Sequence, residues 1–135
     1  MSIEDRLADL GIDLPPVAKP VAAYVPAIQV GDQISTSGQL PLVSGSLPMT
    51  GLVGDQISQG DAAGQARVAA LNALAAAADV AGGVNNIRRV VRVVVYVAST
   101  ADFTAQPAVA NGASELLGEI FGDAGRHIRS AIGVA

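Results

Sequence analysis

Residues 87–100, IRRVVRVVVYVAST, decide the fold of this chain. Six valines and a tyrosine fall within ten residues of this stretch, and β-branched and aromatic side chains favour the pleated surface of a sheet. Because successive side chains of a strand point to opposite faces, a strand over residues 90–98 would have two apolar faces. One face would carry Val91, Val93, Val95 and Val97, and the other Val90, Val94, Tyr96 and Ala98. Such a strand needs cover on both sides.

Helical patterns lie on both sides of this strand. In residues 58–81, apolar side chains recur at intervals of three and four, and Gly82-Gly83 follows, which predicts a long helix. The recurring residues are Ala62, Ala66, Ala69, Ala70, Ala73, Leu74, Ala77 and Val80. Their small size would let the helix pack closely on the strand. A second helix is expected over residues 106–121, with Pro107 in its first turn, where a missing N–H costs no hydrogen bond.

The first twenty residues predict a helix and a linker. Ser2 is followed three residues later by an acid, which is a helix-start signal, so residues 2–10 should form a short helix. The prolines of DLPPVAKP, residues 13–20, then keep the chain extended. No later change of composition marks a boundary. We therefore expect residues 1–135 to form a single domain, with residues 1–20 as its N-terminal helix and linker.

A β-hairpin is expected next. Residues 22–30 and 33–39 read as extended runs, and the dipeptide Gly31-Asp32 between them is a turn signal, so the two strands should be antiparallel. Residues 41–56 contain several glycines and prolines among scattered apolar positions. This segment is too irregular for a helix or strand and too apolar for a solvated loop. We expect it to lie against the body of the domain.

The element order indicates an α+β fold. A hairpin is followed by helix, strand, helix and a last strand in residues 126–135, RHIRSAIGVA, so two main helices would cover one face of a mixed sheet. The strand at 90–98 is apolar on both faces, and the chain offers no further element for the second face. Another copy of the chain is the simplest cover, which predicts an oligomer.

Composition excludes several classes of function. Half of the 135 residues are apolar, the formal net charge is −4, and no basic run is longer than Arg88-Arg89, so nucleic acid is not an expected partner. The chain has no cysteine and a single histidine, so we expect neither a metal centre nor a thiol nucleophile. The acidic start and the lack of an apolar run of bilayer length predict a soluble, cytoplasmic protein without a membrane partner.

Arg129 is the strongest candidate for a binding residue. By alternation it shares a face of the last strand with the small residues Ala131 and Gly133, and a guanidinium there requires an anion because its charge cannot be shed. A substrate carboxylate would suit its planar fork. The alternative is a salt bridge between subunits, to an acid such as Glu115 or Glu119. Beside it, Arg126 and His127 are expected mainly at the surface, although a histidine can act as an acid or base.

The ordered set of features resembles the reactive intermediate/imine deaminase family, also called RidA-like or YjgF-like, in a divergent branch. The resemblance runs from about Val21 to the end of the chain. Its features are the tyrosine ahead of the hairpin, TSGQLP closing it, GQARVAALNALAAAADVAGG, IRRVVRVVVYVASTADF, Asn111 in the second helix, and RHIRSAIGVA. The resemblance implies a chorismate-mutase-like fold, a barrel-like homotrimer, and hydrolytic deamination of imines and enamines to 2-keto acids in three clefts between subunits.

The resemblance also implies roles for individual residues. Arg129 would anchor the substrate carboxylate, and Tyr24 would line the cleft as a second catalytic residue. The backbone around Gly38 would form the floor, and Asn111 and Ala131 would also contact the substrate, with no metal or organic cofactor. Read without the resemblance, the same positions have structural explanations. Tyr24 could cap the sheet edge, Gly38 could serve a turn or bulge, and Asn111 could cap a backbone group.

The acid or base of the reaction is the open point. Deaminases of the family carry a glutamate on one more C-terminal strand, whereas this chain stops at Ala135, so that strand is either missing from the sequence or absent from the protein. An unpaired sheet edge would then be open to association. The second hypothesis is therefore a non-catalytic trimer that binds small carboxylates. A ribonuclease, a role sometimes given to this family, is disfavoured by the acidic charge and by the lack of a histidine pair.

Overall fold

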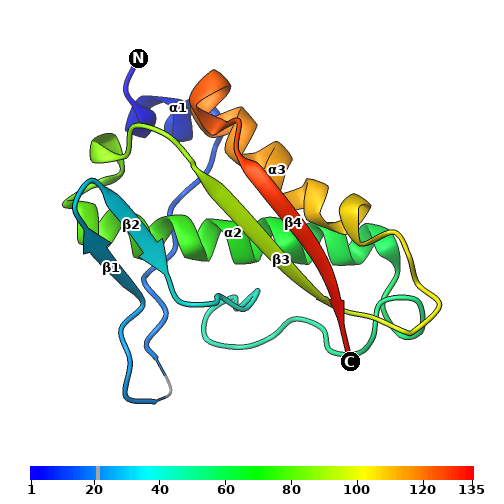
Figure 1. Cartoon of the computed structure of the whole chain (residues 1–135). Coiled ribbons are helices and arrows are strands. Elements are labelled where there is room, and N and C mark those ends of the chain that lie inside the picture. Colours follow the sequence, from blue (N-terminus) through cyan, green and yellow to red (C-terminus); the bar gives the residue numbers. More distant parts are fainter. Residues whose placement is uncertain (21) are drawn as a thin grey trace.

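The computed structural model describes residues 1–20 and 22–135, in which three α-helices and four strands follow one another in the predicted order (Figure 1). The elements are α1 (Ile3–Asp9), β1 (Ala27–Val30), β2 (Gln33–Thr36), α2 (Gln59–Ala81), β3 (Arg92–Ala98), α3 (Gln106–Phe121) and β4 (Ile128–Val134), with 3₁₀ turns η1 (Val84–Asn86) and η2 (Gly122–Gly125). The predicted helix boundaries at 58–81 and 106–121 are confirmed to within one residue.

Strands β3 and β4 are parallel neighbours, with α3 connecting them. Their register runs from the pair Arg92 and Ile128 to the pair Ala98 and Val134. Along β3 the alternation holds: Val97 is buried against the helices, whereas the side chain of Tyr96 points the other way and is 66% exposed. None of the described residues of one chain covers Tyr96 on the second apolar face of this strand.

The assignment of side chains to the two faces of residues 90–98 is wrong for the first two residues. Val90, which we placed with Tyr96, packs on the helical core, whereas Val91 is 53% exposed. The reason is that β3 begins only at Arg92. Residues before that point do not follow the strand's alternation, because they are not held in an extended ladder.

We predicted a single mixed sheet, and this prediction is wrong for the described residues. They form two separate two-stranded sheets, the antiparallel β1–β2 hairpin and the parallel β3–β4 pair. The hairpin packs on α2 and not beside β3. Its strands are shorter than predicted, with β1 beginning only after Pro26, a residue that has no N–H to donate to a sheet ladder.

Residues 41–56 lie against the body of the domain, as predicted. Val53 is buried; its N–H donates to the carbonyl of Ala98 at 2.8 Å, and its own carbonyl accepts from the N–H of Thr100 at 3.0 Å. The buried Asn72 of α2 holds the start of this segment, because its Nδ2 donates to the carbonyls of Leu40 and Leu42, each at 3.0 Å. The start of the segment is thus held on α2 and Val53 is held at the end of β3, whereas residues 43–48 between them are exposed.

Helix α2 is the central support of the fold. The Ser58 side chain caps its first turn by accepting from the N–H of Asp61, and Gly82, with a φ of 82°, ends it. The set of apolar residues predicted to be buried along α2 covers less of the helix than the structure buries. The reason is that α3, the hairpin and residues 41–56 surround α2 on several sides. Its buried residues are Ala62, Ala66, Asn72, Leu74, Ala75, Ala76 and Ala78.

Helices α2 and α3 pack very closely. A Cβ atom at Gly112 of α3 would overlap the carbonyl of Ala63 in α2, so this crossing requires glycine. On the other side of the crossing, Leu74, Leu116 and Ile120 belong to a core that also takes in Leu7 of α1. The N-terminal helix is therefore part of the same packed unit.

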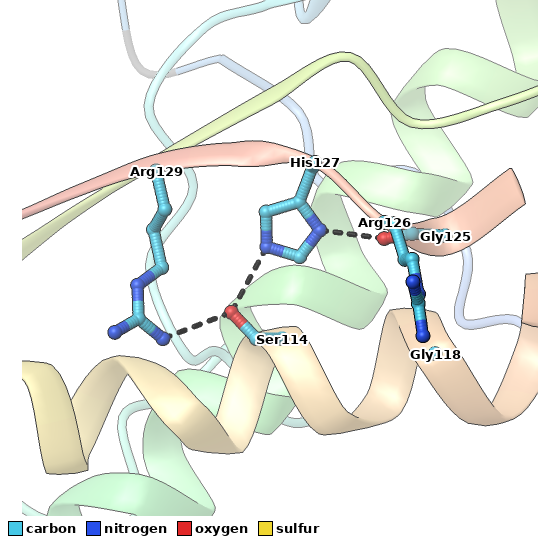
Figure 2. A pocket seen from close by; sticks show the side chains of 6 residues that line it. All are labelled: Ser114, Gly118, Gly125, Arg126, His127 and Arg129. Atoms are coloured by element: carbon cyan, nitrogen blue, oxygen red, sulfur yellow. Dashed lines mark hydrogen bonds between the residues drawn. The ribbon is translucent and has the colours of Figure 1, made fainter. Parts of the chain in front are cut away.

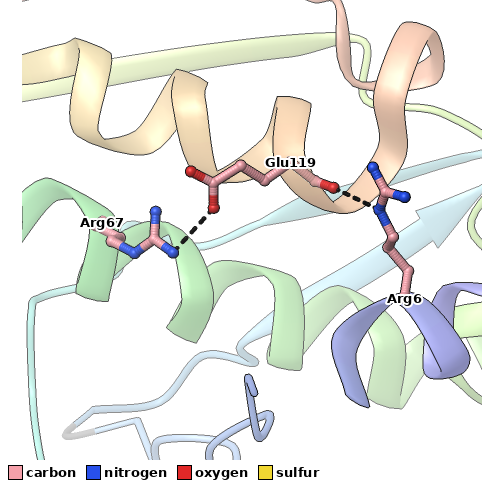
Figure 3. A network of polar contacts seen from close by, with 3 residues as sticks. All are labelled: Arg6, Arg67 and Glu119. Carbon is pink, nitrogen blue, oxygen red and sulfur yellow. Dashed lines mark hydrogen bonds and ion pairs between the residues drawn. The ribbon is translucent and has the colours of Figure 1, made fainter. Parts of the chain in front are cut away.

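Polar contacts support the docking of α1 (Figure 3). Ser2 and Asp5 form the predicted helix start, each side chain accepting from the other residue's N–H. Arg6 donates from Nε to the carbonyl of Glu119 at 2.9 Å. The carboxylate of Glu119 in turn pairs with Arg67 of α2 at 3.0 Å. One residue of α3 thus links to both other helices.

None of the helices in the described residues is both long and apolar enough to cross a membrane.

Candidate functional site

Strand β4 presents Arg129 to helix α3. The positions of Arg129, Ala131 and Gly133 alternate with those of Ile128, Ile132 and Val134, whose side chains face outward. At Gly133 a Cβ would lie 2.7 Å from Nε2 of Gln106, the first residue of α3. The three residues share one face of β4, as the alternation predicts, and the structure places this face on α3.

The guanidinium of Arg129 has neutral partners. Its Nη1 donates to Oδ1 of Asn111 at 2.7 Å and to Oγ of Ser114 at 3.2 Å. Asn111 and Ser114 are three residues apart on α3, so both lie on the helix face next to β4. Within the described chain, the N–H groups of Nε and Nη2 of Arg129 make no hydrogen bond to another residue.

The acids that we considered as salt-bridge partners lie elsewhere in this chain. Glu119 pairs with Arg67, and Glu115 borders a second hollow between α2 and α3. Apart from a long contact between Arg126 and Asp123 at 3.8 Å, no other ion pair forms within residues 1–20 and 22–135. The positive charge of Arg129 is therefore not neutralised within the described part of the chain.

His127 lies beside the same serine (Figure 2). Its Nδ1 is 2.6 Å from the carbonyl of Gly125 and its Nε2 is 2.9 Å from Oγ of Ser114. A carbonyl only accepts hydrogen bonds, so Nδ1 carries a proton. In the neutral ring Nε2 is then the acceptor, and the Ser114 hydroxyl donates to it.

The surface position predicted for His127 is wrong, whereas the one for Arg126 is right. The side chain of Arg126 is 86% exposed, but His127 is half-buried and bonded at both ring nitrogens. The cause is the close approach of η2 to α3: a Cβ at Gly125 would overlap the carbonyl of Leu117. This contact brings the start of β4 against Ser114.

These side chains border an open pocket of about 320 Å³. Its lining residues are Ser114, Gly118, Gly125, Arg126, His127 and Arg129. The volume is at the low end of the range for small-molecule sites. At Gly118 there is open space where a Cβ would be, so no side chain of this residue covers the α3 side of the pocket. The guanidinium groups of Arg126 and Arg129 give this open pocket a positively charged border.

The structure brings together some of the predicted site residues and not others. Arg129 and Asn111 are in contact, and Ala131, half-buried, follows on β4. Tyr24 and Gly38 flank the hairpin, which packs on α2, and they border neither of these hollows. Ser114 was not among the predicted site residues, although its spacing of three from Asn111 on a predicted helix was a usable signal.

Neither Gly38 nor Tyr24 has a clear structural role within the described part of one chain. The φ of Gly38 is not positive, and no atom lies within 4 Å of where its Cβ would be, so neither strain nor crowding requires glycine there. Tyr24 is 48% exposed. In the described residues no group of three His, Cys, Asp or Glu side chains is placed to hold a metal ion.

A β-hairpin followed by two helices packed on a parallel strand pair, with an arginine pocket between strand and helix, defines a small α+β domain of the chorismate-mutase-like type. Residues 4–133 match the family described as "YjgF/chorismate_mutase-like, putative endoribonuclease". The chain belongs to this family, which confirms the resemblance seen in the sequence.

Individual relatives agree with this assignment. Protein TCP17 of Trypanosoma cruzi is 40% identical over 131 residues, which are 96% of this chain and 82% of that protein. A crystal structure named as a putative endoribonuclease from Shewanella oneidensis superposes with a TM-score of 0.94 at 34% identity, over 99% of this chain and 89% of that one. Protein Atu1372 of Agrobacterium tumefaciens, of unknown function, gives a TM-score of 0.88 at 40% identity, over 98% and 82%.

Proposed function

We propose that the pocket beside Arg129 binds the carboxylate of a small 2-imino or 2-keto acid, and that the protein hydrolyses reactive imines and enamines to 2-keto acids. The observation that carries this proposal is the pairing of Arg129 with neutral groups only, in the described chain, at the border of an open pocket. A charged guanidinium that is held in place but not neutralised is suited to an anionic ligand.

The geometry supports an anchoring role. Nη1 is occupied by Asn111 and Ser114, which hold the guanidinium plane, while the N–H groups of Nε and Nη2 can form the two parallel bonds that a carboxylate accepts. Hydrolysis then adds water to the carbon of the C=N bond and expels ammonia, leaving the 2-keto acid. With the carboxylate fixed, the reacting carbon is positioned for an oriented water, and no metal or organic cofactor is required.

We further propose that the working form is a barrel-like homotrimer with the sites between subunits. The face of β3 and β4 that points away from the helices exposes large apolar side chains, which are Tyr96, Ile128, Ile132 and Val134. Sheet faces of this kind are normally covered. A neighbouring subunit could also bring its Tyr24 and the backbone at Gly38 to the pocket. This contact would explain why a tyrosine and a glycine occupy these two positions.

A second candidate, a trimer that binds small carboxylates without turnover, is favoured by one observation. No aspartate or glutamate lines the pocket, so the described residues offer no carboxylate to activate the attacking water. The name of the Shewanella relative suggests a third role, RNA cleavage, but the net charge of −4 argues against a surface that follows phosphates.

The test generates imines with an amino-acid oxidase and measures 2-keto acid release with and without the protein. Wild type should accelerate release, and both Arg129→Lys and Arg129→Ala should abolish most of the acceleration. Arg88→Ala, at an exposed arginine outside the pocket, is the control. Binding of 2-oxobutanoate, measured by calorimetry, separates the two candidates: binding without acceleration selects the non-catalytic trimer, and neither effect rejects both.

A further inference from the structure

The pocket contains a hydrogen-bond chain that runs in one direction. Arg129 can only donate, so Ser114 Oγ accepts from its Nη1 at 3.2 Å. Ser114 in turn faces Nε2 of His127 at 2.9 Å, and Nδ1 of the same ring faces the carbonyl of Gly125 at 2.6 Å. Because the last group can only accept, each proton in the neutral chain points from Arg129 towards Gly125.

Ser114 is held in an unusual way for a serine within a helix. Such a hydroxyl commonly bonds to a carbonyl one turn earlier in its own helix, where it is unreactive. Here the hydroxyl points away from its helix and lies between a base, His127 just before β4, and a cation, Arg129 within β4 (Figure 2). A hydroxyl that donates to an imidazole, which a third group orients, is the arrangement of an activated nucleophile.

We propose that Ser114 is a nucleophile, with His127 as its general base, and that this pocket hydrolyses small acyl esters. Ser114 Oγ bonds to the acyl carbon while its proton passes to Nε2 of His127. The C–O bond to the alcohol then breaks, and His127 returns the proton to the leaving oxygen. Water attacks the acyl-serine with the same base, which releases the carboxylic acid and regenerates the hydroxyl.

Other groups of the pocket fit these steps. The carbonyl of Gly125 fixes the ring with Nε2 towards the serine, as a carboxylate does in other serine–histidine sites. The guanidinium of Arg129 stabilises negative charge on Oγ and on the oxygen of the tetrahedral intermediate. Gly118 has open space where a Cβ would be, so the acyl group can approach from the open side of the pocket. This activity does not depend on the deamination proposed above.

The first experiment measures acylation by p-nitrophenyl acetate and by a fluorophosphonate probe. Wild type should release nitrophenol and carry one modified residue, located at Ser114 by peptide mass. Ser114→Ala should lose the label, and Ser46→Ala, at an exposed hydroxyl outside the pocket, should keep it. His127→Asn should slow labelling about 100-fold or more, the usual size of general-base catalysis. A labelling rate that is unchanged in His127→Asn would overturn the proposal. So would the absence of a label at Ser114 in the wild type.

A second experiment does not depend on the ester. The chain has no cysteine, so Ser114→Cys introduces a single thiol, whose rate of alkylation by iodoacetamide reports activation by the neighbouring base. The rate should fall at least about tenfold when His127→Asn is added, whereas the same addition to Ser46→Cys, an exposed position outside the pocket, should change nothing. Equal rates in both pairs would overturn the proposal, and circular dichroism checks that each variant is folded.

Discussion

Nη1 of Arg129 in β4 donates to Oδ1 of Asn111 in α3 at 2.7 Å. Asn111 is thus a neutral partner at the position where an acid would neutralise the arginine. The one-atom change Asn111→Asp should create an internal ion pair, and 2-oxobutanoate should then bind about 10- to 100-fold more weakly, the equivalent of a charge-assisted hydrogen bond. Calorimetric titration measures this. Asn111→Ala should weaken binding less, so equal losses in both variants would contradict the argument.

Two glycines of α3 should respond oppositely to the same substitution. Gly112→Ala forces a Cβ onto the carbonyl of Ala63 and should cost roughly 1–3 kcal/mol of unfolding free energy through overpacking. Gly118→Ala places its Cβ in open space and should stabilise the helix by up to about 1 kcal/mol. Urea denaturation of the two variants tests the pair, and a neutral Gly112→Ala would mean that the helices are not in contact there.

Asn72 should be a strong determinant of stability although it is polar. Its side chain is only 4% exposed and donates to the carbonyls of Leu40 and Leu42. Asn72→Ala leaves those acceptors without a partner and should cost about 1–3 kcal/mol. Thermal unfolding gives the magnitude, and hydrogen exchange should show faster opening in residues 40–56. Asn85→Ala, which removes an exposed contact to the N–H of Glu4, should cost less.

The outward face of β3 and β4 should control assembly. Tyr96→Asp or Ile128→Asp puts a charge into a face that we propose is covered by a neighbouring subunit, and should shift a trimer towards monomer. Leu10→Asp, at an exposed leucine beside α1, is the control and should leave the assembly intact. Light scattering measures the oligomeric state of each variant and of the control. A wild type that is monomeric at micromolar concentration would remove the basis of the prediction.

Local sequence patterns were enough to identify the elements of this protein and one face of its site. Signals such as the helix start at Ser2, the stop at Gly82 and the alternation around Arg129 act over a few residues, so they can be recognised without a fold. The family could be recognised for a related reason, because its features occur in a fixed order along the chain.

Which elements pair and which side chains meet depends on tertiary contacts. The separation of the hairpin from β3, the partial burial of His127 and the placement of Ser114 all depend on contacts between separate elements, such as the hydrogen bond between Ser114 of α3 and His127 just before β4. Strand propensity contains no information about the partner strand, and a lone histidine has no local pattern. The hydrogen-bond chain through Ser114 exists because β4 crosses α3 at that point and not because of any motif.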